Sequence, residues 1–190
     1  MSVVVMEAVG GKSLDHVNKI LAGFPGAAYS AAYNALKRAG DTAKTRAGQF
    51  AAAEYTITKS SFMRNVTEKT VVSGGAAGVA EMKISFAGNV LPLLTFNTRF
   101  GRDGRVQTQV KRNGGASTLE HAFVAKVFGP AAVFERLGTS RLPIEQKFGP
   151  STAHMMENDQ VVEQMETTIR ETFDARLDHE TTRILNGWGG

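Results

Sequence analysis

The chain has 190 residues, of which 42% are hydrophobic and 21% are charged, a composition typical of a globular protein rather than a disordered one. The absence of cysteine excludes disulfide bonds and thiolate metal sites, and the absence of a long apolar run argues against a membrane span. We expect a single domain over residues 1–190, with residues 1–12 as an N-terminal arm.

The net charge of +4 is distributed unevenly along the chain. From His154 to Gly190 there are eight acidic and three basic side chains, which give −5 and leave +9 for residues 1–153. This asymmetry predicts that the acidic segment folds back on the basic body or docks on a neighbouring copy. Nucleic-acid binding is a third interpretation of the basic body.

Residues 13–68 are predicted to be helical. A short amphipathic helix ends at Phe24-Pro25, and an alanine-rich helix follows from Pro25 to about Tyr55, because alanine is the best helix former. A further turn or two of helix is expected near Thr58.

Residues 69–148 change to a β pattern, which predicts a central antiparallel sheet. Met82, Ile84 and Phe86 alternate with polar residues and should share one face of a strand. The expected strands are Thr70–Ser73, Ala80–Ala87, Val90–Phe96, Arg105–Lys111, Glu120–Phe128 and Ala132–Arg136.

Residues 153–186 are predicted to contain one long amphipathic C-terminal helix, from roughly Glu157 to Leu185, so the fold class is α+β. About 28 residues would span roughly 42 Å, which exceeds the width of a small domain. The apolar stripe therefore fits either the core or, in part, a contact with another protomer. Its residues are spaced by four: Val161, Met165, Ile169, Phe173 and Leu177.

No arrangement of residues indicates catalysis. The four histidines lack metal-ligand spacing, and the glycine-rich segment Ser73–Gly78 lacks the lysine of a phosphate-binding loop. No serine, histidine and aspartate set can be singled out, and the acids of the last helix read as its solvent face. We expect no enzymatic activity, no cofactor and no metal.

Five basic residues cluster around two predicted turns. They are typical of a solvated hairpin rim, and alternatively they could contact an acidic partner or passing DNA. This cluster comprises Arg99, Arg102, Arg105, Lys111 and Arg112.

The segment from Phe123 to Ser151 resembles the phage minor tail protein Z family, the tail completion proteins of long-tailed phages. The matching parts are AFVAKV, VFERLG, RLPIEQKFGPS and the helix start HMMEN, with LPLLTF and the alanine-rich helix upstream. The resemblance extends from about Pro25 to Leu185, and its most specific part is the RLPI and GPS block.

The resemblance implies a structural virion protein, without enzymatic activity or cofactor, that completes the head-proximal end of the tail so that the tail can join the head. It implies assembly in the host cytoplasm. It also implies a homo-oligomer, no membrane partner, and partners among the tail terminator, tail tube, tape measure and head connector. DNA would be met only as the passing genome. The alternative function is a basic nucleic-acid-binding accessory protein.

The residues of this block predict a docking surface rather than a reactive centre. Val133, Phe134 and Leu137 are expected to anchor a strand in the core, and the segment that follows should be extended and available to a partner's sheet edge. A head-to-tail ring needs unlike faces, which the basic body and acidic helix supply. The docking residues are Arg136, Arg141, Leu142, Pro143, Ile144 and Glu145.

Overall fold

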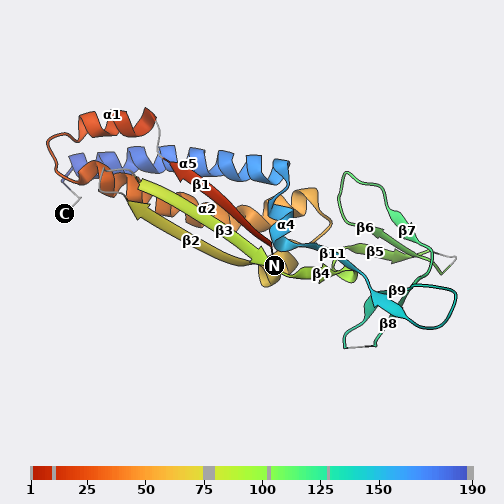
Figure 1. Ribbon diagram of the computed structural model, residues 1–190. Helices are drawn as coiled ribbons and strands as arrows, with labels where there is room; N and C mark the ends of the chain where they lie inside the picture. Colours follow the sequence, from red (N-terminus) through yellow and green to blue (C-terminus); the bar gives the residue numbers. More distant parts are fainter. Residues whose placement is uncertain (1, 10–11, 75–79, 102–103, 128, 188–190) are drawn as a thin grey trace.

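The computed structural model describes residues 2–9, 12–74, 80–101, 104–127 and 129–187. The fold is α+β, with antiparallel sheets, a long helix in the N-terminal half and another at the C-terminus. Helices and a three-stranded sheet form one end of the elongated molecule, and smaller sheets form the other (Figure 1). Among the described helices, none is both long enough and apolar enough to cross a membrane.

The three-stranded sheet has the order β1-β3-β2, with β1 at Ser2–Val9, β2 at Thr67–Gly74 and β3 at Ala80–Gly88. The prediction of a simple arm at residues 1–12 was therefore wrong. The β-branched run Val3-Val4-Val5 favours a strand, and β1 pairs with β3 along its whole length. Side chains that alternate along β3 face the helices, and Met82, Ile84 and Phe86 are all buried, as the sequence predicted.

Helix α1 covers Lys12–Ile20, α2 covers Ala27–Glu54 and α3 covers Lys59–Asn65. Thr58 caps α3, because its Oγ1 accepts a hydrogen bond from the backbone N–H of Ser61 at 3.2 Å. Helix α2 packs against β3 and also against α5, which lies beside it with the opposite chain direction (Figure 1). Six alanines spaced by four along α2 are buried: Ala31, Ala35, Ala39, Ala43, Ala47 and Ala51.

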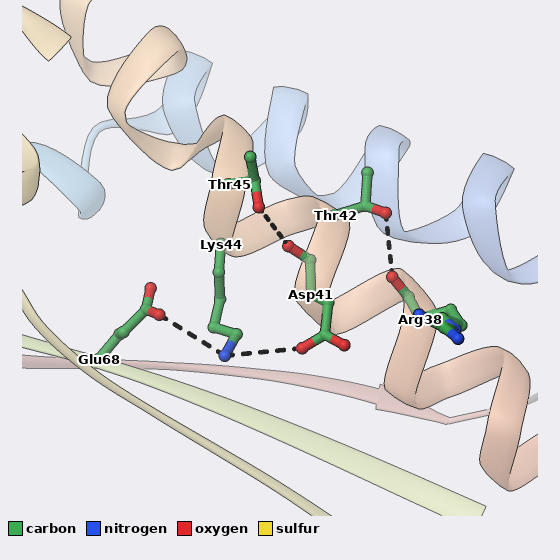
Figure 2. A network of polar contacts seen from close by, with 6 residues as sticks. All are labelled: Arg38, Asp41, Thr42, Lys44, Thr45 and Glu68. Carbon is green, nitrogen blue, oxygen red and sulfur yellow. Dashed lines mark hydrogen bonds and ion pairs between the residues drawn. The ribbon is translucent and has the colours of Figure 1, made fainter.

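A polar network ties α2 to the edge strand β2 (Figure 2). The Nζ of Lys44 lies 3.5 Å from Oε1 of Glu68 on β2 and 3.7 Å from Oδ1 of Asp41 one turn earlier. On the same helix, Thr42 donates to the carbonyl oxygen of Arg38 and Thr45 donates to that of Asp41. Lys44 therefore fixes the position of this strand relative to the helix that covers it.

The long C-terminal helix predicted from about Glu157 to Leu185 is confirmed, whereas the residues just before it form a separate short helix. Helix α4 covers Thr152–Met156 and is capped by Ser151, whose Oγ accepts from the N–H of His154 at 3.1 Å. Helix α5 covers Asp159–Leu185 and is capped by Asn158, whose Oδ1 accepts from the N–H of Gln160. Two separate N-caps explain why the helix restarts after residue 157.

The predicted single sheet over residues 69–148 is also wrong, because the described strands form four small sheets. Strands β4 and β11 pair with each other and connect the helical end to the rest, with the short helix η1 at Leu93–Thr95 after β4. We call the remaining two sheets, residues 97–146, the β lobe. The strands are β4 Val90–Pro92, β5 Asn97–Phe100, β6 Val106–Gln109, β7 Ser117–Leu119, β8 Ala122–Ala125, β9 Ala132–Arg136, β10 Ile144–Gln146 and β11 Phe148–Ser151.

Candidate docking surface

Strand β10 forms an edge of the β lobe, where the sheet order is β10-β9-β8. Leu137 donates its N–H to the carbonyl oxygen of Pro143 at 3.2 Å, and Lys147 donates to that of Val133 at 2.8 Å. Because antiparallel residues alternate between facing the partner strand and facing away, Ile144 and Gln146 direct their backbone N–H and C=O groups away from β9. No strand of the described residues lies beyond β10, so this edge can pair with an added strand.

The prediction for the anchor of this segment was partly wrong. Val133 and Phe134 are at most 1% exposed and hold β9 in the core, as expected. Leu137, however, is 62% exposed, because the chain leaves the sheet after Arg136. An exposed leucine next to an open strand edge is a feature of binding surfaces rather than of folding cores.

We call residues 136–145 the ledge, which includes all six predicted docking residues. Leu142 is 65% exposed, the highest value among the large hydrophobic residues described as exposed, and Leu137 follows it. The peptide bond between Leu142 and Pro143 is cis, and of the three residues 142–144 that were expected to be extended, only Ile144 lies in a strand. The ledge therefore presents two leucines beside the free edge of β10.

Arg136 and Arg141 give the ledge positive charge. The Arg136 guanidinium lies 4.6 Å from the centroid of the Phe123 ring, which holds it on the surface of the sheet by a cation–π interaction. Both arginines line an open hollow of about 700 Å³, together with His121, Leu137 and Thr139. The chemistry of this surface suits a partner that combines carboxylates with small or apolar groups.

Glu145, predicted to help fix register, is part of an ion-pair cluster that the sequence did not reveal. Lys147 Nζ lies 2.8 Å from Oε2 of Glu135 on β9 and 3.7 Å from Oε2 of Glu145 on β10. The hydrogen bond that Lys147 donates to Glu135 is the main cause of the raised pKa of Lys147. The single ammonium of Lys147 is shared by two carboxylates, so the cluster keeps a net charge of −1, and it joins β10 and β11 to β9.

The basic residues of the two turns do not form one free cationic patch. Arg112 donates its Nε–H to the carbonyl oxygen of Ala52 at 2.7 Å, and the Nζ of Lys111 lies 6.0 Å from the centroid of the Tyr55 ring. Both residues therefore attach the β lobe to the end of α2.

The other basic residues of that cluster have local partners or are not described. Arg105 Nη1 lies 3.9 Å from Oε1 of Glu120, and Arg99 donates its Nε–H to Oδ1 of Asn97 at 3.2 Å. Arg102 lies outside the described residues, as do residues 75–78 of the glycine-rich segment. This cluster is less suited to DNA binding, because some of its basic side chains make contacts that hold the fold together.

A polar hollow of about 480 Å³ lies where the β lobe meets the helices. Its hydroxyl and amide groups bond to one another: the N–H of Asn97 donates to Oγ1 of Thr56 at 3.1 Å, and Nε2 of Gln109 donates to the carbonyl oxygens of Arg112 and Gly114. The bond between Asn97 and Thr56 joins residues 41 apart in sequence and so ties the lobe to the segment after α2, whereas the bonds of Gln109 stay within the lobe.

The apolar stripe of the last helix lies inside the chain. Its five predicted residues are at most 7% exposed and join the core that includes α2, so they are not open to a neighbouring protomer. The opposite face of α5 is exposed and carries charges of both signs, and in the middle of the helix the carboxylates of Glu171, Asp174 and Asp178 are interspersed with Arg170 and Arg176. Any contact of α5 with a neighbour would use this outer face.

Within the described residues, no three His, Cys, Asp or Glu side chains lie together as a metal site would require. Sequence reasoning missed His121 and Phe123 as neighbours of the ledge, because their proximity depends on strand pairing across β8 and β9. The signal that could have found Phe123 is the pairing of two short apolar strands around the Gly129-Pro130 turn.

Comparison of the chain with protein-family models, with characterised proteins and with solved structures gave no match.

Proposed function

We propose that this chain is a structural virion protein that completes the head-proximal end of a phage tail, so that the tail can join the head. The observation that carries the proposal is the ledge: two exposed leucines, two arginines and a free strand edge gathered at one end of an elongated molecule. Such a surface binds another protein by added strand pairing and apolar contact, without any bond being made or broken.

The sequence resemblance supports the same function. Its most specific block, RLPIEQKFGPS, covers Arg141 to Ser151, and this block comprises the second half of the ledge, β10 and β11. Strand β11 pairs with β4 and leads directly into α4, so the block also connects the ledge to the helical end. Because this block connects the two ends of the molecule, it suits a protein that links a tail to a head.

The direct test is binding of the purified protein to phage tail tubes assembled without it, followed by joining of those tails to filled heads. We expect the wild type to bind the tubes and to restore head joining. Leu142→Asp should weaken tube binding at least about 10-fold, because a charge replaces an exposed anchor at the centre of the surface. The matched control is Val127→Asp, which changes an exposed apolar residue of the same lobe outside the ledge.

Failure of the wild type to bind tubes or to restore joining would overturn the proposal. DNA binding at micromolar concentration that falls steeply with added salt, and that is lost in Arg99→Ala and Arg105→Ala variants, would instead favour the nucleic-acid-binding alternative.

A further inference from the structure

We infer that the hollow beside the ledge binds a carboxylate side chain of a partner protein, with an aliphatic residue of that partner packed against Leu137. We call it the basic hollow, and its lining includes His121, Arg136, Leu137, Thr139 and Arg141. The inference deepens the proposed function, on which its biological role rests, by naming the chemistry that the ledge would recognise in a tail or neck component.

The basic hollow has positively charged groups and no carboxylate in its lining. Arg136 and Arg141 supply two guanidinium groups, and His121 adds an imidazole beside them. Among the side chains that the structure describes, no carboxylate pairs with either of these arginines. The nearest acidic residue along the chain before β8 is Glu120, whose Oε1 lies 3.9 Å from Nη1 of Arg105, a residue outside this lining.

The acidic residues of β9 and β10 lie on the other side of the sheet from Arg136. Glu135 and Glu145 are opposite each other in the pairing of these strands, so their side chains share one face of the sheet. Arg136 is the next residue after Glu135 and therefore has its side chain on the other face. Both carboxylates are close to Lys147, at 2.8 Å and 3.7 Å. The charge of the basic hollow is thus left for a ligand.

Arg136 is held in an arrangement that suits a carboxylate. Its guanidinium lies over the ring of Phe123, 4.6 Å from the centroid, so one face of the group is covered by the ring. Its backbone N–H donates to the carbonyl oxygen of His121 at 3.3 Å, which fixes the start of the side chain beside β8. The N–H groups at the edge of a guanidinium form a planar fork that matches the two oxygens of a carboxylate.

Leu137 favours a protein ligand over a nucleic acid. This side chain is 62% exposed and lines the same hollow as the two arginines. The phosphate backbone of DNA offers charge without an aliphatic side chain, whereas a peptide can place leucine or valine next to aspartate or glutamate. The Thr139 hydroxyl adds a neutral donor for the second carboxylate oxygen.

The first test is peptide binding to the full-length protein, followed by nitrogen–proton NMR of the arginine Nε–H groups. The probe is a short capped peptide in which leucine precedes aspartate, and its matched control has asparagine in place of aspartate. The aspartate peptide should shift the Nε–H signals of Arg136 and Arg141 saturably at about millimolar concentration, whereas the asparagine peptide should not. The variants Arg136→Lys and Arg141→Lys assign the two signals. A peptide with serine in place of leucine should bind at least about 3-fold more weakly, because its contact with Leu137 is lost.

The second test uses tail tubes whose exposed carboxylates have been converted to neutral amides by a carbodiimide and an excess of amine. The wild type should bind these tubes at least about 10-fold more weakly than tubes treated with the amine alone. Arg136→Gln/Arg141→Gln should bind unblocked tubes with a similar loss, and blocking should change its binding by less than about 2-fold, because the same contact is already absent. The control Arg99→Gln/Lys126→Gln removes the same charge from the β lobe outside the hollow and should behave like the wild type. Circular dichroism melting checks that each variant is folded, and electron microscopy checks that the blocked tubes are intact.

The inference is overturned if the aspartate and asparagine peptides shift the arginine signals alike or not at all, or if a short DNA duplex shifts them and the aspartate peptide does not. It is also overturned if the wild type binds blocked and unblocked tubes equally well, in which case the proposed function stands without it. If the aspartate peptide binds as expected but no form binds tubes or restores head joining, the carboxylate site stands and the proposed function fails.

Discussion

Arg112 donates its Nε–H to the carbonyl oxygen of Ala52 at 2.7 Å, while its backbone N–H donates to the carbonyl oxygen of Glu54 at 2.8 Å. Both carbonyls belong to the last turn of α2, where no further helical N–H groups exist to bond them. The guanidinium also places positive charge at the negative end of the helix dipole. One residue of the β lobe thus caps the longest helix, and through it the ledge is oriented relative to the helical end.

Arg112→Ala should therefore lower the free energy of unfolding by roughly 1 kcal/mol, the cost of a hydrogen bond from a charged group at an exposed position. The measurement is urea denaturation followed by circular dichroism. Arg112→Lys should recover part of the loss, since the ammonium keeps the charge near the helix end but cannot reproduce the geometry of Nε. Arg99→Ala is the control, because Arg99 bonds only within its own strand among the interactions described. An Arg112→Ala midpoint equal to that of the wild type would contradict the capping role.

The alanine stripe of α2 gives the second prediction. Ala43 is fully buried and lies on the stripe that runs along the middle of α2. Ala43→Leu should destabilise the protein by about 1–3 kcal/mol, since extra methylenes in a filled interior force neighbouring side chains and helices apart. Ala53→Leu on the exposed side of the same helix should change stability by less than about 0.5 kcal/mol. If both variants unfold at the same urea concentration, the stripe is not tightly packed.

The parts of the fold that were predictable are those in which one periodic pattern meets one buried face. Met82, Ile84 and Phe86 alternate because one side of β3 lies under α2, and the stripe from Val161 to Leu177 recurs because one side of α5 faces the core. In each case, burial of one face requires apolar residues at the regular spacing of the strand or helix, and this spacing is visible in the sequence. The two long helices and the α+β class followed from the same patterns, whereas the short helices α4 and η1 did not.

The features that sequence could not show depend on long-range pairing. Residues 2–9 were predicted to be part of an arm, because they become part of a sheet only by pairing with β3, about 80 residues later in the sequence. Leu137 was predicted to lie in the core, because the apolar character of a residue does not show where its strand ends. The ledge residues were found through the specificity of their motif, whereas Phe123, which holds Arg136, became a neighbour only through the register of β8 and β9.

Gly88 at the end of β3 gives the third prediction. A Cβ atom at this position would overlap Oγ1 of the buried Thr152 and lie 3.0 Å from the carbonyl oxygen of Asn65. Thr152 itself donates to that carbonyl at 3.2 Å, so the glycine allows strand, helix α4 and the end of α3 to meet. Gly88→Ala should cost about 1–3 kcal/mol by overpacking.

The matched control for Gly88→Ala is Gly138→Ala in the ledge loop, where nothing lies within 4 Å of an added Cβ. It should unfold at nearly the same temperature as the wild type. A second variant, Gly88→Ala/Thr152→Ala, should recover stability relative to Gly88→Ala, because the overlapping hydroxyl is removed. If Gly88→Ala were as stable as the wild type, the contact between β3, α4 and the end of α3 would have space for a Cβ atom, which would contradict the prediction.

Tyr55, which follows α2, gives the last prediction. Its side chain is 2% exposed, and burial raises the pKa of the phenol above its ordinary value of 10.0, although a hydrogen bond with Asn158 acts in the opposite direction. The folded state therefore holds the neutral phenol to higher pH than the unfolded state does. Its contribution to stability is complete below about pH 10 and is lost as the pH rises through the raised pKa.

We expect the free energy of unfolding to fall above pH 10 less steeply in Tyr55→Phe than in the wild type, as measured by urea denaturation at a series of alkaline pH values. Lys147, whose pKa is also raised, adds to the alkaline loss in both proteins, so the difference between them isolates the phenol. Subtracting the tyrosinate absorbance titration of Tyr55→Phe from that of the wild type gives the titration of Tyr55 alone. A midpoint at or below pH 10.0 in that difference curve would show that Tyr55 is not shielded from water, and that the junction between α2 and α5 is open.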